Sequence, residues 1–232
     1  MGKTNVEYAD EQITIYPTCV YRCKYCWASL PIWRYRIRNP NPIREAMRIA
    51  RSRKRKAVVI SFTSDPYQPR ERNEMLTRRV LEILLLRSKV RHTIMILTKN
   101  PRLALERDYI LIKKFGVWLG TTLTSTEKIP DEPYAPSNRE RIEMLKAAHS
   151  AKILTWVSIE PWIPGVTDPA EIVKTTHEFV DWYVIGRLDY ETQLGYPKAP
   201  EGWYAQKLPE IINLLRKLNK PYHIKKQLKK NP

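Results

Sequence analysis

All three cysteines of this 232-residue chain lie in one short segment, CVYRCKYC (19–26). Cys19, Cys23 and Cys26 have the spacing C-x3-C-x2-C, and thiolates at such short spacings bind zinc or iron–sulfur clusters. A structural zinc site needs a fourth ligand, and the four histidines are scattered along the chain without the spacing of finger ligands. Three thiolates on one loop can instead hold a cubane cluster and leave one iron open. The spacing therefore favours a 4Fe–4S cluster over three unrelated core cysteines, which are the alternative.

Apolar runs alternate with helical patterns along the whole chain. Strands are expected over 13–16, 57–62, 92–97, 117–123, 153–159, 182–186 and 222–226, and helices over 43–52, 74–87, 102–114, 138–149, 169–180 and 209–219. Ser137 followed by Glu140 predicts a capping box at the start of the helix 138–149. The alternation predicts an α/β fold with a parallel sheet, in a partial (β/α)6-type barrel. A doubly wound open sheet is the alternative.

We expect a single domain over 1–232, with a core over about 13–190. A C-terminal helix, a short strand and a basic tail follow over 191–232. Active-site residues of such barrels lie at the C-terminal ends of the strands. The loops in these positions are the cysteine loop, TSDPYQP (63–69), TKNP (98–101) and EPWIPG (160–165). These loops are therefore expected to meet at one edge of the sheet.

The motif and its loops resemble the radical S-adenosylmethionine (SAM) superfamily over roughly residues 13–190. The cysteine motif is specific when it follows the first strand of a βα series and has an aromatic residue before its last cysteine, as in CKYC. The resemblance is closest to the spore photoproduct lyase-like branch, through FTSDPYQP (62–69), LTKNP (97–101), TLTS (122–125) and APSNRER (135–141). SIEP (158–161) and KPYHIKKQL (220–228) are also similar to a phage-associated group of radical SAM proteins.

The resemblance implies two cofactors, a 4Fe–4S cluster and SAM. Cys19, Cys23 and Cys26 would hold three irons, and the fourth iron would bind the amino and carboxylate groups of SAM. One electron, from a donor such as ferredoxin or flavodoxin, would break a C–S bond and release a 5′-deoxyadenosyl radical that abstracts hydrogen from the substrate. The resemblance identifies no catalytic residue beyond this cofactor site.

The resemblance also assigns cofactor-binding side chains in the loops after the strands. Tyr25 would pack near the adenine, or it orders the cysteine loop. Ser64 and Asp65 would contact SAM, with the carboxylate receiving the methionine ammonium, although Asp-Pro is also an ordinary turn initiator. Lys99 would pair with the SAM carboxylate, or it is a solvated lysine.

Two further residues of the predicted cofactor site follow the fourth strand. Thr122 stands where the branch has a serine for the ribose or the methionine, and nearby threonines offer alternative registers at Thr121, Thr124 and Thr126. Arg141 would brace this loop or SAM, or it lies on a solvated helix face.

One position departs from the branch. Phe62 stands where spore photoproduct lyases carry a cysteine hydrogen donor. Because all three cysteines are assigned, no thiol remains to quench a product radical, to hold an auxiliary cluster or to carry a methyl group. We therefore expect a minimal radical SAM enzyme, and the departure disfavours spore photoproduct repair.

The chain carries 41 Lys and Arg against 24 Asp and Glu, a formal net charge of +17. Such a charge favours polyanionic partners, although it can also serve solubility. Three basic runs stand out: WRYRIR (33–38), expected to border the cluster, RSRKRK (51–56) and KKQLKK (225–230). They suit phosphate contact and base stacking, or they are solvated surfaces.

We therefore expect a DNA or RNA substrate, in a repair lyase-like or modification reaction. The alternatives are a nucleic-acid-binding protein with a structural metal, and a radical SAM enzyme acting on a peptide or small metabolite. The sequence has no apolar run of membrane-spanning length and no apolar signal core, so a cytoplasmic location is expected. It gives no indication of oligomeric state.

Overall fold

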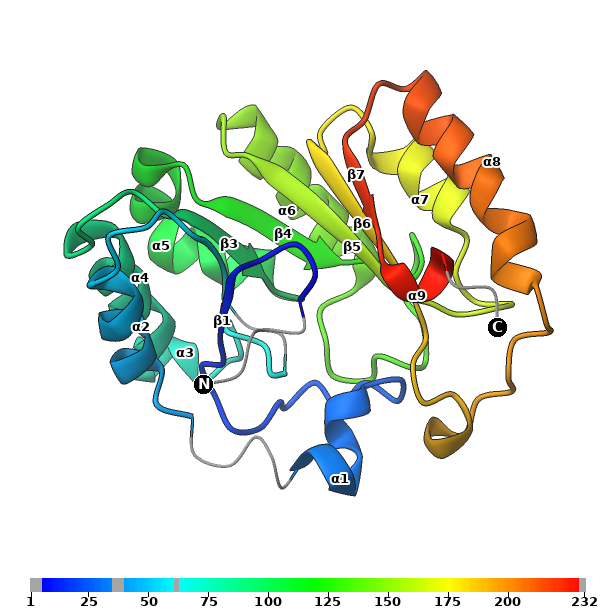
Figure 1. Cartoon of the computed structure of the whole chain (residues 1–232), viewed down its shortest axis with the longest axis horizontal. Coiled ribbons are helices and arrows are strands. Elements are labelled where there is room, and N and C mark those ends of the chain that lie inside the picture. The colour runs from blue at the N-terminus through cyan, green and yellow to red at the C-terminus, as the bar shows by residue number, and fades with distance from the viewer. Residues whose placement is uncertain (1–5, 35–39, 61–62, 230–232) are drawn as a thin grey trace.

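The computed structural model describes residues 6–34, 40–60 and 63–229. In these ranges seven strands form one parallel sheet in chain order, and they curl into a half-barrel (Figure 1). The strands are β1 (Glu11–Ile13), β2 (Ala57–Ile60), β3 (Thr93–Leu97), β4 (Trp118–Thr122), β5 (Thr155–Trp162), β6 (Trp182–Arg187) and β7 (Tyr222–Ile224). The expected partial barrel is confirmed, and the doubly wound alternative is wrong because its strand order would reverse partway through the sheet.

Longer helices alternate with the strands and cover the outer face of the sheet (Figure 1). They are α2 (Pro42–Ala50), α4 (Leu76–Leu86), α5 (Pro101–Phe115), α6 (Asn138–Ser150), α7 (Pro169–Thr176) and α8 (Trp203–Lys217). The short elements are α1 (Pro31–Arg34), α3 (Glu71–Glu74), α9 (Lys226–Lys229) and the 3-10 turns Trp27–Ser29 and Thr192–Leu194.

Local sequence explains where the long helices begin. Asn41, Asn100 and Asp168 each cap a helix whose first residue is proline, so the side-chain oxygen satisfies a free N–H and the proline ring fits the first turn. Ser137 caps α6, and its hydroxyl accepts from the N–H of Glu140 at 3.2 Å. The helix start predicted there is confirmed.

Several predicted bounds differ from the structure: the helix expected over 209–219 is Trp203–Lys217, and the one expected over 169–180 ends at Thr176. Two further differences have a clear physical cause. The first strand ends at Ile13 rather than at Tyr16, because side-chain contacts with the loop after β2 replace the sheet ladder. The N–H of Tyr16 donates to Ser64 Oγ at 3.3 Å, and Ser64 Oγ donates to the Tyr16 carbonyl at 2.7 Å. The helix expected over 74–87 is divided at Met75, whose φ of 49° is left-handed. The carboxylate of Glu71 then accepts from the N–H of Thr77 at 2.9 Å and caps α4.

Aromatic rings fill the inside of the half-barrel toward the N-terminal ends of its strands. Trp156 and Trp182 have ring centroids 5.4 Å apart, Trp118 lies 6.5 Å from Trp182, and Tyr8 lies 5.8 Å from Trp156. Gly120 pairs with Trp156 in the sheet, and a Cβ at Gly120 would lie 2.3 Å from the indole. The glycine therefore allows the indole to lie flat across β4. In the part of the chain that the structure describes, no helix is both long and apolar enough to span a bilayer.

Candidate active site

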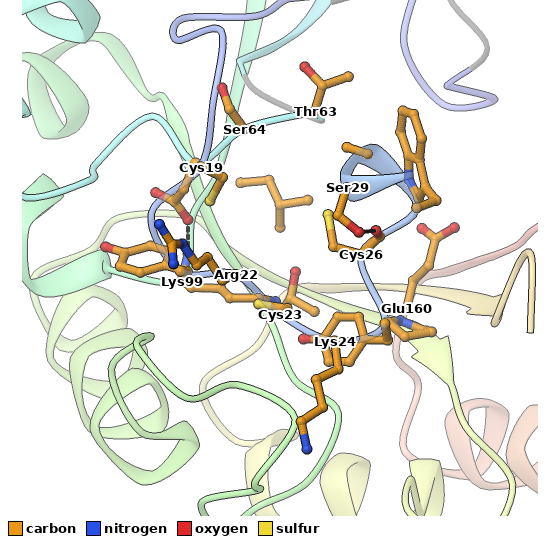
Figure 2. A pocket seen from close by; sticks show the side chains of 18 of the residues that line it. Cys19, Arg22, Cys23, Lys24, Cys26, Ser29, Thr63, Ser64, Lys99 and Glu160 are labelled. Atoms are coloured by element: carbon orange, nitrogen blue, oxygen red, sulfur yellow. Dashed lines mark hydrogen bonds between the residues drawn. The ribbon is translucent and has the colours of Figure 1, made fainter. Parts of the chain in front are cut away.

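A cavity of about 1010 Å³ opens at the C-terminal ends of the strands. The loops that were expected to meet there do meet. The cavity is lined by residues 17–29, 63–65 and 97–99, by Thr122 and Tyr134, by Ser158, Glu160 and Pro161, and by 187–189. Figure 2 shows Cys19, Cys23 and Cys26 around one hollow, with Lys99 to one side and Glu160 to the other.

The loop after β2 holds the cysteine loop in place through a buried glutamine. Gln68 donates through Nε2 to the Thr18 carbonyl at 2.9 Å and accepts through Oε1 from the N–H of Val20 at 2.8 Å. The same Nε2 donates to the Asp65 carbonyl at 2.9 Å. Both flanks of Cys19 are therefore fixed to TSDPYQP, the segment that follows β2.

Cys23 is buried, Cys19 and Cys26 are partly buried, and burial is the main influence on the protonation of all three thiols. It raises the pKa of Cys19 to about 11 and that of Cys23 to about 12, and it also raises the pKa of Cys26. The charge of Asp65 adds to the shift of Cys19, while the N–H groups of Asp65 and Tyr21 oppose it. A bound cation must displace these protons, so ligation and deprotonation are coupled.

The spacing of the thiols suits a cluster. Over the described ranges, no three His, Cys, Asp or Glu side chains form a group that could hold a metal ion. A cubane cluster makes a different demand, because each thiolate binds its own iron and the three must be spread around the cluster. Three free thiols on one loop, all lining one cavity, fit that group.

Asp65 joins the loops after β2 and β3. Its carboxylate accepts from the N–H of Lys99 at 2.6 Å, from Thr98 Oγ1 at 2.7 Å and from the N–H of Tyr67 at 2.9 Å. The last contact is the local turn expected of Asp-Pro, so Asp65 both initiates the turn and lines the cavity. Burial raises its pKa despite these donors. Ser64 lines the cavity beside it.

Glu132 was missed in the sequence, and it organises the positive side of the cavity. It lies 3.4 Å from Lys99 Nζ, and it also pairs with Arg141 and accepts from the hydroxyl of Tyr25. Lys99 Nζ lies 5.3 Å from the centroid of the Tyr25 ring, and its side chain is only 13% exposed. The alternative of a solvated lysine is therefore wrong. Tyr25 fixes the cysteine loop to residues 129–132, and its contact with adenine stays a prediction.

Thr122 and Arg141 separate into two roles. Thr122 lines the cavity, whereas Thr124 bonds to Glu132 at 3.3 Å and Thr126 to Glu171 at 2.6 Å. Arg141 is fully buried, so the solvated helix face is wrong. It donates to the Thr122 carbonyl at 3.0 Å and to the Pro136 carbonyl at 2.7 Å. Among the described residues, it is not one of those that line the cavity. Its place supports the bracing role.

Glu160 lines the far side of the cavity and forms an ion pair with Lys225, which is not among the described residues that line the cavity. Lys225 Nζ lies 2.5 Å from Glu160 Oε1, and their side chains are 7% and 16% exposed. Gly186 lies behind the pair, and a Cβ there would come within 2.8 Å of the Glu160 carboxyl. Burial raises the pKa of Glu160, and Lys225 opposes the shift. SIEP and KPYHIKKQL were noted in the sequence without a role, and the structure joins them here.

Other predicted features lie outside the described residues. These are Phe62, residues 35–38 of WRYRIR and Lys230 of KKQLKK. Trp33, at the start of WRYRIR, packs edge-on against Trp27 with centroids 5.2 Å apart, and Trp27 lines the cavity. RSRKRK lies just before β2, at the opposite end of the strand from the cavity.

Solved structures of one protein, SuiB, have a similar fold. SuiB of Streptococcus suis bound to S-adenosylmethionine matches with a TM-score of 0.67 at 15% identity, over 93% of this chain and 50% of that one. SuiB bound to its precursor peptide SuiA matches with a TM-score of 0.67 at 13% identity, over 93% and 48%. The chain spans about half the length of these solved structures.

Sequence comparison gives the family. An uncharacterized protein of Methanocaldococcus jannaschii is 28% identical over 94% of this chain and 90% of its own length. A sequence model of the radical SAM superfamily matches residues 13–179. That superfamily uses a 4Fe–4S cluster and SAM, and the three free thiols that line the cavity fit this chemistry. The likeness to the spore photoproduct lyase-like branch stays a prediction. The chain belongs to the radical SAM superfamily, and it is a radical SAM enzyme.

Proposed function

We propose that this enzyme acts on a nucleic acid, by abstracting hydrogen from a nucleotide held in the cavity. The observation that carries the proposal is the net charge of +17, together with Arg22 and Lys24 on the lining of the cavity. Both side chains are exposed, and cations at a cavity mouth attract phosphate groups. A cytoplasmic location and a ferredoxin or flavodoxin donor are part of the same proposal.

The residues divide the cavity into two halves. Cys19, Cys23 and Cys26 hold the cluster, and Ser64, Asp65, Lys99 and Thr122 hold SAM beside it. When bound, the cluster and SAM supply hydrogen-atom abstraction from a substrate. Asp65 has a lone pair left on Oδ2 to accept from the methionine ammonium, and Lys99 can donate to the methionine carboxylate.

Glu132 and Arg141 position the groups that make these contacts. Glu132 keeps Lys99 against the Tyr25 ring, and Arg141 fixes the backbone at Thr122. The opposite half, with Glu160 and Lys225, is left for the substrate. The positions of Lys99 and Glu160 on opposite sides of the hollow support this division (Figure 2).

The cofactor assignment is tested by anaerobic reconstitution with iron and sulfide. The wild type should show a 4Fe–4S absorbance and should form 5′-deoxyadenosine from SAM when dithionite is added. Cys23→Ala should lose both, because Cys23 has no substitute thiol. Ser150→Ala, on an exposed residue of α6, is the matched control and should retain both. Zinc binding without SAM cleavage would favour the structural-metal alternative.

The substrate proposal needs a separate test. A single-stranded oligonucleotide should raise the yield of 5′-deoxyadenosine, and the gain should fall as salt is raised, because phosphate contacts release counterions. A gain with a peptide, or one that salt does not change, would instead favour the peptide or small-metabolite alternative.

A further inference from the structure

Nine exposed cations lie at the end of the half-barrel opposite the cavity. They occupy three helix-to-strand loops, each taken together with the last turn of the helix before it, and these loops precede β2, β3 and β4. The residues are Arg51, Arg53, Lys54, Arg55, Arg87, Lys89, Arg91, Lys113 and Lys114, and we call them the basic edge. The segments 51–56, 87–92 and 113–117 contain no Asp or Glu. The basic edge is therefore a surface of one sign.

Hydrogen bonds make the three loops contiguous. The N–H of Lys89 donates to the Ala50 carbonyl at 3.0 Å, which joins the first loop to the second. Arg91 Nη2 donates to the Phe115 carbonyl at 3.1 Å, which joins the second loop to the third. Because the loops precede three neighbouring strands, their side chains form one patch rather than three separate clusters.

None of the described residues balances the charge of the basic edge through an ion pair. Among the described residues, no ion pair of at most 4.0 Å involves any of the nine cations. Two acidic residues at the start of β1 have other partners. Glu11 pairs with Arg48 and Lys56, and Asp10 accepts from the N–H of Ala57 at 2.8 Å. Unbalanced positive charge on a fixed backbone suits a polyanion.

We propose that the basic edge binds the phosphate backbone of a nucleic acid at a surface separate from the cavity. Arginine and lysine supply the phosphate contacts, which fix a polymer without reading its sequence. The proposal rests in part on the proposed function, and it adds a second surface that holds the polymer while the cavity receives a nucleotide.

An acidic electron donor is a weaker match for this surface. β3 alone spans roughly 17 Å, at about 3.3 Å per residue over its five residues, and it separates the basic edge from the cavity. Electron transfer falls steeply with distance, so a donor serving Cys19, Cys23 and Cys26 must approach from the other end of the strands. A nucleic acid has no such restriction, because its chain can extend past the domain.

The test is charge reversal in the full-length holoenzyme. Arg53→Glu, Lys54→Glu and Arg55→Glu are combined, and binding to a labelled oligonucleotide is measured between about 50 and 200 mM salt. We expect at least about a tenfold loss of affinity at low salt, and a fall of about 2 to 3 in the slope of log affinity against log salt. The matched control combines Lys146→Glu, Lys174→Glu and Lys207→Glu, exposed residues of α6, α7 and α8. It makes the same change in net charge and should lose much less.

The outcomes separate this inference from the proposed function. Equal losses of affinity in both triple variants, or wild-type affinity in the first, would contradict the proposal that the basic edge binds nucleic acid. So would a loss of SAM cleavage by the first variant when no oligonucleotide is present, because the surface would then not be separate from the cavity. Binding to vesicles of anionic phospholipid but not to the oligonucleotide would identify a lipid surface instead. If the oligonucleotide binds through the basic edge but does not change the yield of 5′-deoxyadenosine, the result would support this inference and contradict the proposed substrate.

Discussion

At the scale of single residues, the carboxylate of Glu132 balances the positive charges of Lys99 and Arg141 beside the cavity. It is 4% exposed, and it pairs with Lys99 and Arg141. Burial alone would raise the pKa of Glu132, but the two cations lower it to about 2. In the unfolded chain the pKa returns to about 4.3. The ionised carboxylate therefore stabilises the fold above the unfolded pKa, and this contribution is lost as the pH falls toward 2.

Glu132→Gln should lower the free energy of unfolding by about 3 kcal/mol at pH 7, because it leaves two buried cations without their partner. The difference from wild type should shrink as the pH falls below about 4.3. Urea unfolding of the apoprotein across this range measures it. Glu143→Gln, in an exposed pair with Arg139, is the control and should change little. A difference that stays constant with pH would show that packing, rather than charge, is lost.

For the pair of Lys225 with Glu160, we expect the opposite dependence of stability on pH. Without its ammonium, the Glu160 carboxyl is left in a buried site where its pKa is already raised. Lys225→Met should therefore destabilise the fold more at pH 8 than at pH 5, because the unfolded chain ionises Glu160 freely while the folded chain resists it. We expect a loss of about 3 kcal/mol at pH 8 by urea unfolding. A greater loss at pH 5 would refute this account of the pair.

The sequence predicted the site residues that lie at the C-terminal end of a strand or in the loop after it. The cysteines, Ser64, Asp65, Lys99 and Thr122 line the cavity because the C-terminal ends of parallel strands meet at one edge. Glu132 lies in an irregular loop, where no periodicity places a side chain. Lys225 becomes part of the site only because β7 joins the sheet next to β6. These two residues required the three-dimensional structure.

At the scale of elements, the packing of β4 against β5 depends on one missing side chain. Trp156 lies across Gly120, and its Nε1 donates to the Ile96 carbonyl at 3.0 Å, so the indole cannot shift freely. Gly120→Ala should lower the free energy of unfolding by about 2 kcal/mol through overpacking. Adding Trp156→Phe should relieve the clash, so the double variant should lose less than the sum of the single variants. Strict additivity of the two losses would contradict this contact.

Element types were predictable where apolar patterns were long, and element ends were not. The strand after residue 117 and the helix after Ser137 lie where the patterns and the cap indicate. Residues 14–16 have a strand-like apolar pattern, yet the polar contacts of Ser64 and Thr63 hold them outside the sheet. Competition from side chains distant in sequence is not visible in a local pattern.

For the whole molecule, composition gave the amount of charge, and the topology determines where it lies. In a parallel sheet, loops that precede strands gather at one edge and loops that follow strands gather at the other. RSRKRK precedes a strand, so its separation from the cysteine loop follows from strand order alone. That RSRKRK forms one surface with residues 87–91 and 113–114 could be seen only from the pairing of β2, β3 and β4.

The indoles inside the half-barrel have an optical consequence. Trp118, Trp156 and Trp182 come from three neighbouring strands, and their rings lie close enough for their electronic transitions to couple. Fixed aromatic packing of this kind produces near-ultraviolet circular dichroism, which disappears when tertiary packing is lost while secondary structure remains. The enzyme therefore carries a built-in spectroscopic reporter of barrel integrity, one that can be followed without a label.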